Sequence, residues 1–172
     1  MKSEGKLMDM LTGYAASHQH PFNIFVHMIG IPTIMLGVLI PLTWVGFEIN
    51  GMHFYLAHVV MLGFFLFYLS LDVIFAVVFA VAAYLLILLA VQLGDYPRNT
   101  AWIIAAVCFF GGYAAQFIGH AVEKSMPVLV KHPIQANLAA PFFTVVELFK
   151  LVGLRSELFD AVQSQIAQQR SQ

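Results

Sequence analysis

No aspartate, glutamate, lysine or arginine occurs between Asp9 and Glu48, and most of this stretch is apolar. A helix needs about 20 mainly apolar residues to cross a bilayer, so residues 22–46 predict a membrane span. Over the whole chain 60% of the residues are hydrophobic and only 10% are charged, against about 25% in soluble domains. We therefore expect one all-α integral membrane domain covering residues 1–172.

Further apolar runs predict a polytopic bundle of four spans. The expected spans are residues 22–46, 52–71, 73–93 and 99–121. Residues 134–152 are apolar but contain Pro141, Glu147 and Lys150, which favours an interfacial or re-entrant helix and leaves a fifth span as the alternative.

Both ends of the chain predict amphipathic helices. Residues 3–18 place Leu7, Leu11, Tyr14 and His18 on one stripe, and the polar tail 155–172 has its own apolar face. Such helices typically lie in the membrane surface.

Lysine and arginine are expected to concentrate on the cytoplasmic side of a membrane protein. With four spans both termini share one side, and the other side holds Arg98 alone. The shared side holds Lys2, Lys6, Lys124, Lys131, Lys150, Arg155 and Arg170. Both termini are thus predicted to be cytoplasmic. The formal net charge of −1 argues against a nucleic-acid partner.

Polar and ionisable side chains gather at the mouth of the first predicted span. Tyr14 and His18 are four residues apart, as are Asn23 and His27, so each pair shares a helix face. Pro21 lies between the pairs and is favourable only in the first turn of a helix. Two helices meeting at this corner could aim both histidines at one point.

The end of the last predicted span carries a second polar face. Gln116, His120 and Glu123 are spaced by four and three residues, which places them on one side of a helix. This face lies at the same depth as His18 and His27, so the three histidines could be neutral imidazole ligands. Imidazole suits iron, zinc or copper, with Asn23, Gln116 and Glu123 orienting the ligands.

Each of these residues also has a simpler structural interpretation. The histidines could form an ordinary polar interface, and His20 could cap a helix instead of being a fourth ligand. Lys124 could be a positive membrane anchor or could hold a substrate carboxylate. Tyr14 could be an interfacial aromatic or a hydrogen-bond donor, and His132 is a loop residue with an open role.

Several familiar catalytic motifs are missing from the sequence. It has no phosphate-binding glycine-rich loop, no HExxH zinc motif and no serine nucleophile elbow. The clustered histidine boxes of membrane desaturases are also absent.

The polar segments together resemble the membrane 2-hydroxy fatty acid dioxygenase family over roughly residues 10–152. The similar motifs are Tyr14-x3-His18, Pro21-x-Asn23-x3-His27-x2-Gly30-x-Pro32, Gln116-Phe-Ile-Gly-His120-x2-Glu123-Lys124-x2-Pro127 and Ala140-Pro141-Phe-Phe-x4-Glu147-x-Phe149-Lys150. Two departures are His20, where another polar residue is expected, and Lys131-His132-Pro133, which replaces a more acidic stretch.

The resemblance implies an Fe(II)-dependent α-oxidation, in which a 2-hydroxy fatty acid and O2 give the acid one carbon shorter and CO2. It implies that His18, His27 and His120 bind iron, with His20 as a candidate fourth ligand. Tyr14 and Lys124 are candidates to hold the substrate carboxylate, with Asn23 and Glu123 beside the metal. The implied setting is fatty acid and sphingolipid breakdown, in the endoplasmic reticulum of a eukaryote or the inner membrane of a bacterium.

Two other functions remain open at this point. His27 and His120 could be the axial ligands of a haem b electron carrier. The histidines could instead line a proton or substrate path in a small transporter. The sequence does not indicate the oligomeric state.

Overall fold

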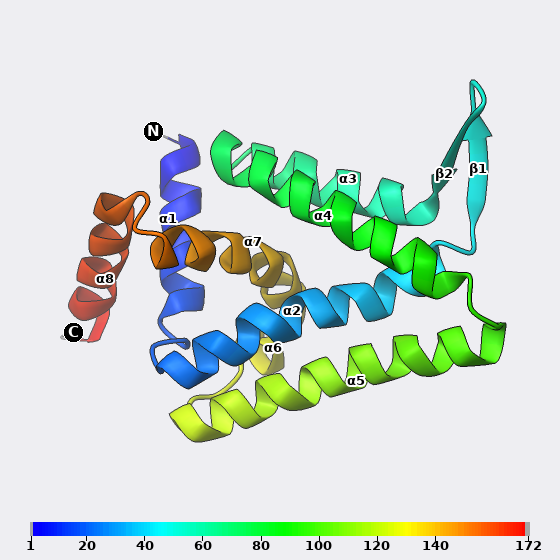
Figure 1. Ribbon diagram of the computed structural model, residues 1–172. Coiled ribbons are helices and arrows are strands. Elements are labelled where there is room, and N and C mark those ends of the chain that lie inside the picture. The colour runs from blue at the N-terminus through cyan, green and yellow to red at the C-terminus, as the bar shows by residue number, and fades with distance from the viewer. Residues whose placement is uncertain (1, 171–172) are drawn as a thin grey trace.

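The computed structural model describes residues 2–170. Apart from one short β-hairpin and the connections, the described part is helical, and Figure 1 shows the longest helices running side by side with the terminal helices packed at one end. The elements are α1 (Lys2–Ala15), α2 (Pro21–Leu42), β1 (Gly46–Ile49), β2 (Met52–Tyr55), α3 (Leu56–Leu69), α4 (Val73–Gly94), α5 (Arg98–Glu123), α6 (Val128–Lys131), α7 (Pro133–Leu151) and α8 (Ser156–Arg170).

Among the described residues, three helices are long and apolar enough to cross a membrane. These are α2 and α4, with 22 residues each, and α5, with 26. A fourth candidate arises only if α7 and α8, which meet at an angle of 117°, are taken as one bent span. The chain is therefore a membrane-type helical protein with three to four candidate spans.

The predicted span 52–71 is wrong in its extent. Its first residues form strand β2, and α3 has only 14 residues, which rise about 21 Å against the ~30 Å core of a bilayer. Strands β1 and β2 pair antiparallel through the two-residue turn at Asn50 and Gly51. Both turn residues have positive φ, 51° and 77°, as the preferred hairpin turn requires.

Helices α2 and α5 approach each other unusually closely because glycines face the contact. A Cβ added at Gly37 would lie 2.7 Å from the carbonyl oxygen of Ala105 and the amide nitrogen of Phe109. A Cβ added at Gly112 would lie 2.6 Å from Ile34 Cγ1. Small residues at such a contact allow two backbones to touch, and this contact sets the spacing of the two helices that carry His27 and His120.

Helix α1 packs on α7, and α8 packs on α1. The predicted stripe of α1 is buried, with Leu11 3% exposed and Tyr14 6% exposed. In α8, Val162 and Ile166 are buried. The hydroxyl of Thr12 donates to Gln165 Oε1 at 3.1 Å. Whether these helices also lie on a membrane surface stays a prediction.

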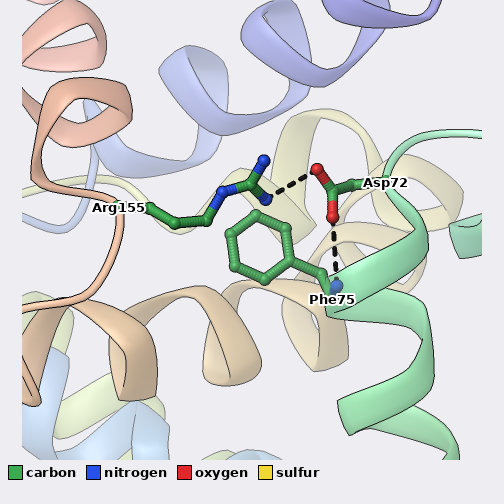
Figure 2. Close-up of polar contacts among 3 residues, drawn as sticks. All are labelled: Asp72, Phe75 and Arg155. Atoms are coloured by element: carbon green, nitrogen blue, oxygen red, sulfur yellow. Dashed lines mark hydrogen bonds and ion pairs between the residues drawn. The ribbon is translucent and has the colours of Figure 1, made fainter.

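An ion pair fastens the α3–α4 turn to the α7–α8 bend (Figure 2). Asp72 caps α4 by accepting from the amide of Phe75 at 3.1 Å, and its other carboxylate oxygen lies 2.6 Å from Arg155 Nη1. The Arg155 guanidinium lies 4.7 Å above the Phe75 ring. This contact holds α7 against α4, and α7 in turn covers the histidine site.

Replacing Gly37 with alanine should force α2 and α5 apart, since the new methyl group would meet backbone atoms that cannot move aside. Overpacking of this kind costs about 1–3 kcal/mol. We expect Gly37→Ala to lower the midpoint of thermal unfolding in detergent and to reduce metal binding. Gly111→Ala is the control, because a Cβ there meets nothing within 4 Å. Equal unfolding midpoints for the two variants would contradict the close contact.

Candidate metal centre

Three buried histidines from three segments meet at one end of the bundle. His18 lies in the connection between α1 and α2, His27 in the second turn of α2, and His120 near the end of α5. Each offers one ring nitrogen, and these nitrogens all lie within 4.8 Å of one another. The ring centroids are 4.4–4.9 Å apart. The predicted convergence of the three histidines is confirmed.

The local sequence explains how the chain turns so that the three histidines come together. Helix α1 ends at Ala15 and α2 begins at Pro21, which is the helix break that the proline predicted. On one straight helix, a spacing of nine residues would place His18 and His27 on opposite faces. The break changes the direction of the chain between them, so both can face the same point. Helix α5 then brings His120 alongside α2 through the glycine contact.

Backbone carbonyls fix the orientation of the first two imidazoles. His18 Nδ1 lies 2.7 Å from the carbonyl oxygen of Tyr14, and His27 Nδ1 lies 2.9 Å from that of Asn23. A carbonyl only accepts hydrogen bonds, so each Nδ1 must carry the proton. Nε2 then has a free lone pair, which is the arrangement usual in metal-binding histidines.

Ser125 positions the third imidazole through its Nδ1 atom. Its hydroxyl oxygen lies 2.9 Å from His120 Nδ1 and its proton is donated to the carbonyl of Ser17 at 3.3 Å. When the serine proton goes to this carbonyl, the oxygen accepts from Nδ1–H and Nε2 of His120 is left free. In all three rings Nδ1 has a hydrogen-bonding neighbour, so Nε2 is the nitrogen that remains for a ligand.

The Nε2 atom of His18 is buried and has no hydrogen-bond partner among the described residues. Leaving such an atom unpaired costs about 1–3 kcal/mol. Burial, followed by the neighbouring His27, lowers the pKa of His18 to about 3, so the ring is neutral and keeps its lone pair near pH 7. A neutral imidazole with an unpaired buried nitrogen fits a metal ligand.

Asn23 and Glu123 tie the end of α5 to the corner between α1 and α2. The Asn23 side-chain amide donates to one oxygen of Glu123, whose other oxygen accepts from the backbone amide of Gln19 at 2.7 Å. Asn23 is fully buried, and its Nδ2 lies 3.5 Å from His120 Nδ1. Both residues therefore lie next to the histidines, as their spacing predicted, and hold the supporting backbone in place.

Tyr14 also belongs to the site. Its ring stacks on that of His18 with the centroids 4.2 Å apart and the planes nearly parallel. Phe143 of α7 packs against both rings, at 4.6 Å from Tyr14 and 5.3 Å from His18. Burial raises the pKa of Tyr14, so its hydroxyl stays protonated and can donate a hydrogen bond.

Three other predicted residues lie outside the three-histidine group. His20 is exposed and caps α2, with its Nδ1 accepting from the amide of Phe22 at 3.2 Å. Lys124 is exposed at the end of α5 with a φ of +56°. His132 is an exposed residue between α6 and α7. The structure therefore gives His20 the cap role and does not bring a fourth histidine to the centre.

Two features of the site were not predicted from the sequence, namely Ser125 and a small cavity. Ser125 is five residues beyond His120, off its helical face, and reaches it only because Lys124 ends the helix in a left-handed conformation. A cavity of about 30 Å³ beside the histidines is lined by Tyr14, Tyr113, Gln116 and Asn137 among others. Only Tyr14 and Gln116 among these four stood out in the sequence.

Comparisons with known proteins point to one family. A family model described as "2-hydroxy-palmitic acid dioxygenase Mpo1-like" matches residues 5–152. The chain is also 31% identical over 148 residues to the 2-hydroxy-palmitic acid dioxygenase MPO1 of Saccharomyces cerevisiae, which covers 84% of this chain and 81% of the yeast protein. No solved structure matches the chain. The matched region includes all three clustered histidines.

Removing the hydroxyl that supports His120 should weaken metal binding without removing a ligand. We expect Ser125→Ala to lower the affinity by about 10–100-fold, the usual effect of losing such a support. The affinity can be measured by titrating metal-free protein with Co²⁺ and following its visible absorption. Ser164→Ala is the control, since that hydroxyl bonds only its own helix backbone in α8. An unchanged affinity in Ser125→Ala would contradict the orienting role.

Proposed function

The chain belongs to the Mpo1-like family, and from this premise we propose that it is a non-haem Fe(II) dioxygenase of 2-hydroxy fatty acids. The observation that carries the proposal is the buried group of three histidines from three segments, whose ring nitrogens lie within 4.8 Å of one another and whose Nδ1 atoms each have a hydrogen-bonding neighbour. The proposed reaction is an α-oxidation that shortens the acid by one carbon.

The proposed reaction balances without an external reductant. The 2-hydroxy acid and one O2 give the fatty acid one carbon shorter, one CO2 and one water. The bond between C1 and C2 breaks, and C2 becomes the new carboxyl carbon. The oxidation removes four electrons from the acid, which equals the number that one O2 accepts when it is fully reduced.

An iron(II) ion bound by the three imidazoles would supply open coordination positions for the substrate hydroxyl, its carboxylate and O2, together with the redox chemistry. The donor set supports this assignment, although imidazoles also suit zinc and copper. We assign His18, His27 and His120 as the ligands. Because His20 caps α2 and is exposed, we propose that solvent or substrate, not a fourth histidine, occupies the remaining coordination positions of the metal.

The other site residues would bind and orient the acid. Tyr14 lines the cavity beside His18, and we assign its hydroxyl to the substrate carboxylate. Asn23 and Glu123 keep the corner and the end of α5 together, so the histidines hold their spacing. Lys124, exposed one residue beyond Glu123, would attract the anionic head group from the membrane surface before it binds.

The position of the site suits a lipid with a polar head. The histidines lie at the ends of the candidate spans α2 and α5 and next to the more polar helix α1, where the His18 ring stacks on Tyr14. With an even number of membrane crossings, the uneven distribution of lysine and arginine supports a cytoplasmic location for both termini and hence for the site. We propose a role in fatty acid and sphingolipid breakdown, in the endoplasmic reticulum or a bacterial inner membrane according to the host.

The haem alternative fits the site poorly. Axial histidines lie on opposite faces of the porphyrin, but the rings of His27 and His120 are only 4.9 Å apart between centroids. The adjoining cavity of about 30 Å³ is also far too small for a macrocycle. A third buried histidine beside them has no place in such a site.

Metal analysis and turnover test the proposal together. Detergent-purified protein, prepared anaerobically with Fe(II), should hold about one iron per chain and show no haem absorption band. With O2 it should convert 2-hydroxyhexadecanoate to the fifteen-carbon acid and release C1 as CO2. His120→Ala should lose both iron and turnover.

An exposed histidine provides the matched control for this test. His53 lies on the hairpin and is paired with Glu48 at 2.9 Å, so His53→Ala should keep iron content and turnover. Full activity and iron in His120→Ala would show that the ligand assignment is wrong. Metal-free but folded wild-type protein that moves a solute across vesicles would favour the transporter alternative.

A further inference from the structure

A larger apolar cavity adjoins the small cavity of the metal centre. Its volume is about 230 Å³, against about 30 Å³ beside the histidines. The two share part of their walls: Tyr113, Gln116, Asn137 and Ala140 line both. The two cavities are therefore neighbours, and a molecule held at the histidines would reach the larger space by passing these shared residues.

The larger cavity runs away from the histidines along α2. Its α2 wall extends from Ile31 to Val38, and Val38 is eleven residues beyond His27, or about 16 Å along the helix. Helices α3 and α5 run in the opposite direction to α2 (Figure 1), so Val60 and Phe109 line the end farthest from the metal. The distance of about 16 Å from His27 to Val38 is of the order of the length of a long alkyl chain.

The chemistry of the walls changes along the cavity. Its polar side chains are Tyr113, Gln116 and Asn137, and all three belong to the part shared with the metal centre. The Tyr113 hydroxyl donates to Asn137 Oδ1 at 2.9 Å, which links α5 to α7 across the shared wall. Beyond this link the lining is entirely apolar. A ligand with a polar head and an alkyl tail matches this gradient.

Another groove of similar size lacks this connection. It lies between α3 and α4, has a volume of about 170 Å³ and is lined by His58, Leu62 and Tyr84 among others. None of its lining residues belongs to the metal-centre cavity. It borders the larger cavity only at Met61, so a tail whose head lies at the histidines would have to cross the larger cavity to reach it.

We propose that the 230 Å³ cavity binds the alkyl tail of the substrate and that Val38 and Val60 limit the tail length. The inference rests on the proposed function, because the occupant is the tail of the 2-hydroxy fatty acid. A tail that arrives from a bilayer gains little by entering another apolar space. Chain-length preference should therefore come from exclusion of tails that are too long.

Filling the far end of the cavity tests the proposal. We expect Val60→Phe and Val38→Phe to lower kcat/KM for the sixteen-carbon 2-hydroxy acid about tenfold or more, since overpacking an apolar site is strongly unfavourable. The eight-carbon acid should keep its wild-type value within about twofold. Iron content should be unchanged in both variants, because neither residue lines the metal-centre cavity.

The neighbouring valine is the matched control. Val59 is 50% exposed on the outer side of α3 and does not line the cavity, so Val59→Phe should keep the wild-type chain-length profile. If Val60→Phe and Val38→Phe both fold, bind iron and keep that profile too, the tail does not occupy this cavity.

Binding without turnover separates this inference from the proposed reaction. Under nitrogen, equilibrium dialysis of labelled 2-hydroxy acids should show weaker binding of the sixteen-carbon acid to Val60→Phe and unchanged binding to Val59→Phe. If this binding pattern is found but the wild-type protein does not oxidise the acid, the proposed reaction is wrong and the proposed tail site stands. If turnover is normal and all variants have the same chain-length profile, the proposed reaction stands and the proposed tail site is wrong.

Discussion

The close contact between α2 and α5 is the constraint on which the site depends. Helices that pack through ordinary side chains lie about 8–10 Å apart, whereas Gly37 and Gly112 let these two backbones touch. His27 and His120 can then bring their ring nitrogens within 4.8 Å of each other. Neither glycine lines the cavity beside the histidines, yet together they set how closely the two helices approach.

The corner between α1 and α2 adds the third histidine and couples the site to the rest of the fold. Glu123 receives hydrogen bonds from the Gln19 backbone and the Asn23 side chain, so the corner cannot move without the end of α5. The unpaired Nε2 of His18 is unfavourable for the metal-free fold. A ligand bound only by the folded state stabilises that state, so metal binding would offset this local cost.

Much of the site was predictable because it follows helix periodicity. The four-residue spacings of Tyr14 with His18 and Asn23 with His27, separated by Pro21, indicated the corner, and the structure confirms it. The same reasoning failed where the chain leaves the helical path. Ser125 reaches His120 only through a left-handed turn, and the span expected over residues 52–71 is partly a hairpin, although its Asn-Gly turn was recognisable.

The tail cavity had no sequence signature because side chains from four helices define it and no helix shows it alone. Its physics differs from that of a water-filled binding site, since the surrounding lipid solvates a tail as well as the cavity does. Affinity must then come mainly from the head group at the histidines and from the polar residues Tyr113, Gln116 and Asn137. The apolar walls would contribute selectivity by steric exclusion, so in the proposed site the histidine end would provide affinity for the polar head and the helices would limit the length of the tail.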